Sequence, residues 1–346
     1  MIRIHDWNRT LSSAALVAAG MFCLAAYAQD ADEHRAHTHD MTPEMLQELR
    51  AKIPLYQEYS DEQIVESMSR MSPDYETYVS DMSVRGKVGI LGLAHGAGEA
   101  GDQGLIGQFS KIGDEYPSAM AFGMSMATSA HIQGAIDQLE EAGAETIVVV
   151  PAIDVRNGSV LPQWQYIFGL QEEASYLSVP RVESSARVVV AESPGDHPVV
   201  SRIMLDFARE LSTDPSKELL IIASHGPEGE EANEKELALL EKHAEFILKE
   251  GGFPDVRIMS IQDDAPTAIR AANVKTFRGW VETAHAEGKE VLVITNLLTT
   301  GSVHKRLQRD LEGLDFKFNE KGLAQHESFV EWVRDSVENQ LTRAGD

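Results

Sequence analysis

The sequence predicts an α/β protein made of two homologous lobes, each a small parallel sheet flanked by helices, preceded by a helical extension. From residue 87 onward, short apolar runs alternate with amphipathic stretches, a pattern typical of parallel strands covered by helices on both faces. Landmarks of the first half also recur, in the same order, in the second half. The chain has 346 residues, 43% of them hydrophobic, which is enough to form the core of one or two domains.

The apolar runs have the length and composition of strands. They span residues 88–93, 119–124, 146–150, 187–191, 219–223, 256–261, 291–295 and 316–318. Amphipathic periodicity predicts helices at residues 129–142, 198–211, 234–249, 274–287 and 325–340. Parallel strands place their carboxyl ends along one edge of a sheet, which is where open α/β sheets bind ligands.

The internal repeat is clearest at two short sequences. Leu-Ala-His95-Gly recurs as Ala-Ser-His225-Gly, at an offset of 225 − 95 = 130. Gly-Ser-Val-Leu161 recurs as Gly-Ser-Val-His304, at an offset of 304 − 161 = 143. Two further segments, residues 141–150 and 196–198, recur at residues 286–294 and 325–327. Because the order is kept and the offsets differ only through loops, the chain is expected to contain two homologous halves.

The N-terminus has the features of a secretory signal. Arg3 and Arg9 stand before an apolar run at residues 11–26, and Ala26-Tyr27-Ala28 supplies small residues for cleavage after Ala28. We therefore expect a periplasmic or secreted protein, with an uncleaved anchor as the alternative. The complete division is a signal peptide at 1–28, a His-rich leader and helical extension at 29–84, a first lobe at 86–213 and a second lobe at 217–342.

The leader and extension differ in composition. Residues 42–53 and 60–71 are expected to be helical, and Ser60 begins a capping pattern. His34, His37 and His39 alternate with acidic residues and form a candidate metal-binding tail. A plain polar leader is the equally weighted alternative.

Composition excludes several classes of function. The formal net charge is −25, which disfavours nucleic acid and anionic lipid as partners. We interpret this negative charge mainly as a source of solubility, and additionally as a field that attracts cations. The only cysteine, Cys23, lies in the signal, so the mature chain has no disulfide or thiolate, and any metal ligands must be imidazole, carboxylate or water. No Walker or dinucleotide-binding motif is present, so no nucleotide cofactor is expected.

Histidines stand at the repeated landmarks. His95 and His225 each follow a predicted strand directly, with glycine next, and His304 lies after the strand at 291–295, in the loop that begins at residue 296. If that strand neighbours the strand at 219–223, His225 and His304 converge at one sheet edge, where two imidazoles bind a divalent ion. The first half has Leu161 in place of the second histidine, which leaves His95 as a weaker candidate and predicts one site.

Carboxylates near these histidines are further candidates. Asp263 and Asp264 follow the strand at 256–261 and are expected at the same edge as His225. Glu228 and Glu230 are weaker candidates, and we interpret them as solvated surface acids.

These landmarks resemble the class II tetrapyrrole chelatases of the CbiX/SirB type, the sirohydrochlorin cobalto- and ferrochelatases. The resemblance covers roughly residues 86–342 and also includes the strand that ends at Pro151 and the helix that begins after His197. It implies a chelatase-like bilobal fold that holds a tetrapyrrole, with His225 and His304 as metal ligands and proton acceptors. The metal implied is Co²⁺ or Fe²⁺, with Ni²⁺ or Zn²⁺ as alternatives. The predicted signal peptide departs from the family in one respect, because metal insertion into sirohydrochlorin is expected to occur in the cytoplasm.

Three functions remain open from the sequence. The first is an exported chelatase-like lyase that inserts or removes a divalent metal in a tetrapyrrole. The second is a non-catalytic periplasmic protein that binds metal or tetrapyrrole, and the third is a structural module with incidental histidines. No membrane association is expected after cleavage, and no feature of the sequence specifies an oligomeric state.

Overall fold

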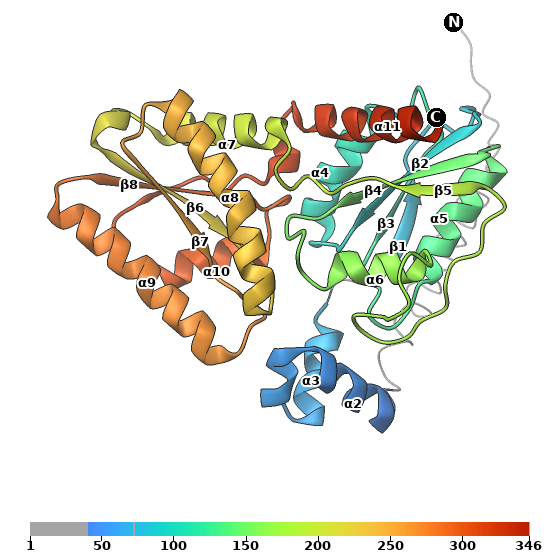
Figure 1. Ribbon diagram of the computed structural model, residues 1–346, viewed down its shortest axis with the longest axis horizontal. Coiled ribbons are helices and arrows are strands. Elements are labelled where there is room, and N and C mark those ends of the chain that lie inside the picture. The colour runs from blue at the N-terminus through green and yellow to red at the C-terminus, as the bar shows by residue number, and fades with distance from the viewer. Residues whose placement is uncertain (1–40, 72, 346) are drawn as a thin grey trace, which may run out of the picture.

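The computed structural model describes residues 41–71 and 73–345. Two sheets lie side by side, each with helices around it (Figure 1). The first has strand order β1-β3-β2-β4-β5 and the second has order β7-β6-β8-β9. The strands of the first sheet are β1 Tyr75–Tyr78, β2 Val88–Ala94, β3 Ser118–Phe122, β4 Thr146–Ala152 and β5 Arg187–Val190. Those of the second are β6 Glu218–Ser224, β7 Asp255–Ser260, β8 Glu290–Thr295 and β9 Lys317–Phe318.

The strand pairing confirms the predicted α/β class. Every pair is parallel except β1 with β3. The central strands β2, β4 and β6 are almost entirely buried, because helices cover both faces of each sheet, and this explains their continuous apolar sequences. The pairing of β6 with β8 also confirms that the strand carrying the His304 loop neighbours the strand that ends at His225.

Strand β1 was not predicted from the sequence, and its residues were expected to belong to the helical extension. It forms an antiparallel edge of the first sheet, and its Tyr75 ring stacks on Phe122 with centroids 4.9 Å apart. Residues 75–78 contain no aliphatic side chain, so the sequence lacks the apolar run that predicted the other strands. Tertiary pairing with β3 therefore decides its structure.

The helices complete the layers. They are α2 Pro43–Lys52, α3 Asp61–Ser69, α4 Glu99–Ser110, α5 Ala130–Glu141, α6 Val160–Ile167, α7 Pro198–Leu211, α8 Glu230–Gly251, α9 Thr267–Ala286, α10 Ser302–Asp310 and α11 Phe329–Gly345. Short 3₁₀ turns occur at η2 Pro54–Glu58, η3 Pro215–Lys217 and η4 Leu323–Gln325. The capping box at Ser60 and Gln63, expected from the sequence, begins α3. None of the helices in the described ranges combines the length and apolarity of a membrane span.

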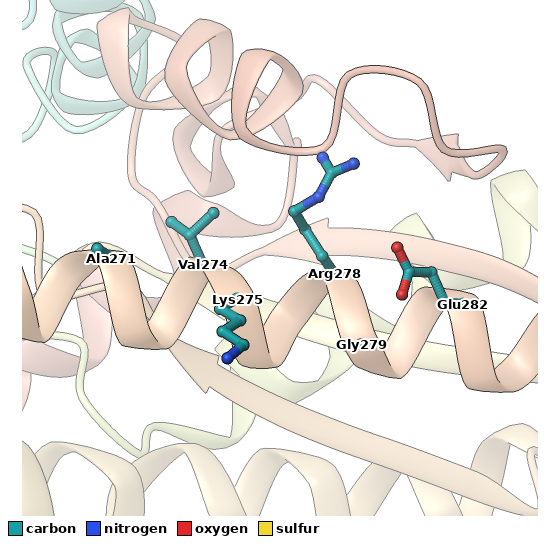
Figure 2. Close-up of a pocket in the computed structure, with 6 residues that line it drawn as sticks. All are labelled: Ala271, Val274, Lys275, Arg278, Gly279 and Glu282. Atoms are coloured by element: carbon teal, nitrogen blue, oxygen red, sulfur yellow. The ribbon is translucent and has the colours of Figure 1, made fainter.

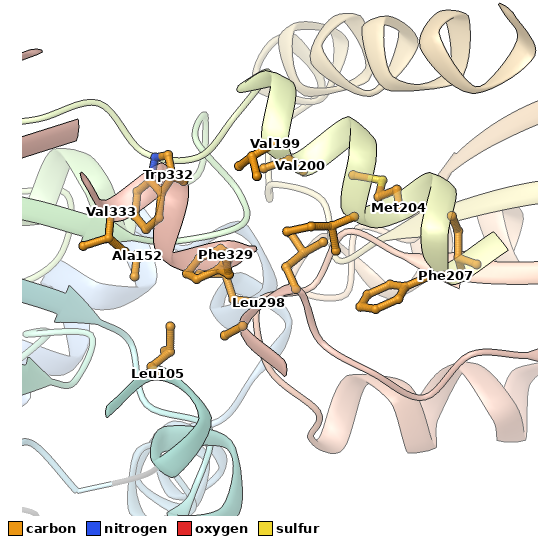
Figure 3. Packing of buried hydrophobic residues seen from close by; sticks show 14 of the residues in the cluster. Leu105, Ala152, Val199, Val200, Met204, Phe207, Leu298, Phe329, Trp332 and Val333 are labelled. Carbon is orange, nitrogen blue, oxygen red and sulfur yellow. The ribbon is translucent and has the colours of Figure 1, made fainter. Parts of the chain in front are cut away.

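The last helix of each half packs on the other half. Helix α7 of the first half packs against α8 and β8, whereas α11 of the second half packs against α4 and β4 (Figure 1). Figure 3 shows the result: Val199 and Met204 of α7 lie beside Phe329 of α11 in one apolar cluster. The core is therefore continuous between the lobes, an exchange that the linear division at residues 213 and 217 did not anticipate.

Candidate functional site between the lobes

His225 follows β6 at the carboxyl edge of the second sheet. Its side chain is 21% exposed, and Nδ1 lies 2.8 Å from the carbonyl oxygen of Gly226. A carbonyl oxygen only accepts hydrogen bonds, so Nδ1 carries the proton in neutral imidazole and donates it to Gly226. The lone pair of Nε2 is then free, and it faces the carboxylate of Asp264 at 3.5 Å from Oδ2.

Glycine is required at position 226. Its φ of +74° belongs to the left-handed region, and a Cβ there would lie 2.0 Å from the hydroxyl of Ser260. The glycine thus lets the loop turn directly over β7, which fixes the hydrogen-bond acceptor that orients His225.

The gap between His225 and Asp264 suits a shared positive ion. An unprotonated Nε2 and a carboxylate are both acceptors, so they repel unless a proton or a metal cation lies between them. Two ligand atoms each about 2.1 Å from a tetrahedral ion lie about 3.4 Å apart. The separation of 3.5 Å between Nε2 of His225 and Oδ2 of Asp264 matches this distance between two ligand atoms.

The electrostatic environment of His225 also favours positive charge. Burial, the largest single influence, lowers its pKa, but the negative charges of Asp264, Asp263 and Asp154, together with the hydrogen bond to the backbone of Gly226, outweigh burial. The pKa of His225 is therefore raised above its usual value. The same field attracts a metal cation.

His304 occupies a different environment. The sequence placed it in a loop, which is wrong: it is the third residue of α10, because residues 302–310 form a helix. The side chain is 2% exposed, with Nε2 3.1 Å from the hydroxyl of Thr295 and the ring in edge contact with Phe318. Burial lowers its pKa, which keeps the ring neutral. Nδ1 is enclosed without a hydrogen-bond partner.

The structure does not place the rings of His225 and His304 in a shared hydrogen-bond or ring contact within the described part of the chain. What they share is the field of Asp154, which acts to raise the pKa of both histidines. Asp154 belongs to the first lobe and follows β4. Asp154 was not among the residues predicted from the sequence, although it follows the end of a strand, as His95 does.

Asp154 and His95 line one small cavity between the lobes. The cavity has a volume of about 30 Å³, and Leu298 and Thr299 of the second lobe form its other side. His95 itself is exposed, and its Nδ1 contacts the carbonyl of Gly96 as His225 contacts Gly226. The space suffices for one water molecule or ion. His34, His37 and His39 lie outside the described residues.

Asp263 has a different role from Asp264. Its side chain is 1% exposed and paired with Arg270 at 2.7 Å and Arg306 at 3.4 Å. Arg270 also binds Asp310 at 2.6 Å. Two guanidinium groups occupy the Asp263 carboxylate, so we interpret it as a structural ion pair that anchors the loop before α9 and leave it out of the proposed ligand set.

Glu228 was expected to be a solvated surface acid, and the structure corrects this. It is half-buried in the loop after His225, and burial is the main reason that its pKa is raised. The charge of Asp264 raises it further, whereas a hydrogen bond with the Ser159 side chain of the first lobe lowers it. A strand-end loop that opens onto another lobe is not visible in local sequence.

The site as it stands supplies two ligand atoms. Within residues 41–71 and 73–345, no group of three or more His, Cys, Asp and Glu side chains is arranged to hold a metal ion.

A second hollow lies away from this site. Figure 2 shows it along one face of α9, where Val274, Lys275 and Arg278 contribute to a surface depression of about 380 Å³. The Arg278 guanidinium donates hydrogen bonds to the carbonyls of Asp310 and Glu312. None of the histidines predicted from the sequence lines it, so it is separate from the candidate site.

Comparison with known proteins supports the fold through structure alone. No protein-family model matches the sequence. No curated protein matches it either. SirB from Bacillus subtilis, solved with Fe³⁺, aligns with a TM-score of 0.55 and 14% identity over 74% of this chain and 98% of SirB. A multi-domain Deinococcus radiodurans protein, described as similar to chelatases with two additional novel domains, has a TM-score of 0.46 and 18% identity over 72% of this chain and 54% of its own length. The chain therefore has the chelatase-like α/β fold of SirB, as its repeated landmarks predicted.

Proposed function

We propose that this protein is an exported chelatase-like lyase that inserts or removes a divalent metal, such as Co²⁺ or Fe²⁺, in a sirohydrochlorin-like tetrapyrrole. The observation that carries the proposal is that Nε2 of His225 faces the Asp264 carboxylate at 3.5 Å, at the sheet edge between the lobes, while Nδ1 is held by the carbonyl of Gly226. The SirB-like fold supports it.

In this proposal His225 and Asp264 hold the incoming metal ion. Insertion releases two pyrrole N–H protons for each divalent ion, so the site needs acceptors as well as ligands. When the metal leaves Nε2, the imidazole of His225 takes one of the two protons and the other passes to solvent, and the surrounding carboxylates stabilise the resulting imidazolium.

His304 is retained as the proposed second imidazole ligand. Its Nδ1 is unpartnered, which suits a ligand, but it is enclosed, so it reaches a metal only after α10 or the neighbouring loop moves. The two histidines therefore differ in their expected effects. His225→Ala removes the first metal contact, whereas His304→Ala affects the transfer step.

A non-catalytic metal-binding protein is the second candidate. It is favoured by the cavity of about 30 Å³ between the lobes, which admits an ion but not a macrocycle. Under this alternative metal binds at His225 and Asp264 or in this cavity beside His95 and Asp154, and no tetrapyrrole is turned over. A chelatase must open its lobes to admit the macrocycle.

The test begins with metal binding by the purified protein. Co²⁺ titration followed by absorbance should give one site, weakened at least tenfold by His225→Ala and by Asp264→Asn. The matched control is His285→Ala, since His285 is an exposed histidine on α9. Unchanged Co²⁺ affinity in both site variants would remove the basis of the proposal.

Turnover then separates the two candidates. Sirohydrochlorin and excess Co²⁺ are followed through the pigment's absorbance, with the enzyme far below the pigment concentration. Many metallated molecules per protein, lost in His225→Ala and reduced in His304→Ala, support the lyase. Metal binding without metallated pigment beyond the uncatalysed rate supports the binding protein.

A further inference from the structure

The N-terminal extension, residues 41–71, is anchored in the first lobe. Leu49 and Ile64 are fully buried in the same apolar cluster as Trp164 and Tyr176 of that lobe. Lys52 adds a hydrogen bond from Nζ to the carbonyl oxygen of Tyr176, at 2.5 Å. Figure 1 shows α2 and α3 below the first sheet, on the side that faces the second lobe. The extension is therefore packed as part of the first lobe.

One carboxylate of this extension reaches the second lobe. Oε2 of Glu58 accepts hydrogen bonds from the hydroxyl of Thr267 at 2.8 Å and from its backbone N–H at 3.4 Å. Thr267 is the first residue of α9. A carboxylate at this place satisfies a free N–H and interacts favourably with the positive end of the helix dipole.

Helix α9 has no cap of its own. Its N-cap residue is Pro266, which makes no side-chain capping hydrogen bond. Glu58, 209 residues earlier in the sequence, supplies the missing acceptor from another part of the molecule. A helix of 20 residues therefore begins on a contact between the lobes.

The capped end adjoins the candidate metal site. Only Ala265 and Pro266 separate Asp264 from Thr267, so fixing the start of α9 also fixes the loop that presents Asp264 to His225. Tyr56, two residues before Glu58, is buried, and the charge of Asp264 contributes to raising its pKa. The extension thus lies within the field of the site as well as in contact with its loop.

We propose that Glu58 is an external cap of α9, through which the N-terminal extension holds the second lobe against the first and positions Asp264 opposite His225. Both Glu58 and Thr267 are exposed, so this latch is a single solvent-accessible contact that opens and closes readily. Other contacts also join the lobes, among them the hydrogen bond from Asn157 Nδ2 to Glu236 Oε2 at 2.9 Å, so release of the latch shifts the balance toward open molecules, which admit a ligand larger than the cavity between the lobes. The effect on metal binding rests on the function proposed above, and the effect on lobe closure does not.

Lobe closure is measured as the distance between two spin labels. Leu170 in the first lobe and Leu248 in the second are 61% and 41% exposed, and Cys23 is the only native cysteine. The full chain with Cys23→Ser, Leu170→Cys and Leu248→Cys therefore carries one label on each lobe. Glu58→Ala should lower the ratio of closed to open molecules about fivefold, the factor that loss of one N-cap typically produces.

Matched variants identify the contact itself. Glu66→Ala removes an exposed carboxylate of the same extension, one that pairs with Arg70 at 3.6 Å within that extension, and should leave the distances unchanged. Glu58→Gln keeps an acceptor oxygen and should restore part of the closed population. Thr267→Ala removes the hydroxyl bond and leaves the backbone bond, so it should open the lobes less than Glu58→Ala does, and the double variant should open them no further than Glu58→Ala alone. Unchanged distances in Glu58→Ala, or additive effects in the double variant, would overturn the proposal.

Co²⁺ affinity provides the second measurement. Glu58→Ala should weaken Co²⁺ binding about fivefold because Asp264 is less well positioned, and Glu58→Gln should recover part of the loss. If the wild-type chain binds no Co²⁺, the proposed function fails while the label distances still decide the latch. If Co²⁺ binds and neither its affinity nor the distances respond to Glu58→Ala, the latch fails while the proposed function stands.

Discussion

Single residues in this protein acquire their chemistry from neighbours that are remote in sequence. His225 is oriented by the carbonyl of Gly226, but its charge preference comes from Asp264 on the next strand loop and from Asp154 in the other lobe. His304 has the same imidazole side chain, but its pKa is shifted in the opposite direction, because burial lowers it. Residue type alone therefore identifies candidates, and their surroundings separate their roles.

Buried His131 allows the same principle to be tested on stability. Burial lowers its pKa from 6.5 to about 4, and Nε2 lies 3.2 Å from the hydroxyl of Ser125. The unfolded chain takes up this proton near pH 6.5, whereas the folded chain resists it until about pH 4. Stability is therefore present above pH 6.5 and is lost as the pH falls, levelling off below about pH 4 at a cost of about 3 kcal/mol.

His131→Gln should remove that part of the pH dependence. Urea unfolding at pH 7 and at pH 4.5 gives the difference in the free energy of unfolding for each variant. The wild type should lose more stability than His131→Gln over this interval, and exposed His285→Gln should behave as the wild type does. An equal loss in His131→Gln and the wild type would show that His131 is not the responsible group.

At the scale of elements, the exchanged helices determine how the halves are joined. Helix α7 completes the second lobe and α11 completes the first, so neither half of the sequence contains all the helices that cover its own sheet. The apolar stripe of α11 places Phe329 and Trp332 in the shared cluster, at 0% and 1% exposure (Figure 3). The C-terminal helix is therefore a core element of the lobe that comes first in the sequence.

Trp332→Ala should destabilise the protein by about 3–5 kcal/mol, because it removes a large buried aromatic side chain and leaves a cavity between the lobes. Arg343→Ala on the same helix is the control, since Arg343 is 68% exposed and should have little effect. Urea unfolding followed by circular dichroism measures both. A loss below about 1 kcal/mol for Trp332→Ala would contradict the packing role assigned to α11.

At the scale of the whole molecule, the shared core predicts cooperative unfolding. One cluster includes Ile90 and Val148 of the first sheet together with Ile222 and Ile294 of the second, joined through α7 and α11. Unfolding either lobe would expose the exchanged helix of the other, so the lobes are expected to unfold together.

Scanning calorimetry tests this expectation. The full chain should show a single transition whose calorimetric and van't Hoff enthalpies agree. Trp332→Ala should lower the temperature of that one transition without splitting it. Two resolved transitions in the wild type would mean that the lobes are independent domains and that the exchanged helices contribute little to their coupling.

Much of the architecture was predictable from the sequence because it depends on local pattern. Continuous apolar strands, amphipathic helices and the repeated His-Gly landmarks predicted two parallel sheets and placed His225 and Asp264 at one edge. The capping signal at Ser60 likewise depends only on neighbouring residues, and the helix begins there. Such features follow from periodicity and from the geometry of parallel strands, which the chain carries locally.

Tertiary structure alone decided the features that join distant parts of the chain. The burial of His304 in α10, the approach of Asp154 to the histidines of the second lobe and the cap that Glu58 provides for α9 all depend on how the lobes meet. Burial and electrostatic fields depend on distance in space and not on separation in sequence. The sequence by itself therefore determined the two sheets and their candidate residues, and the packing between the lobes determined which of those residues face one another.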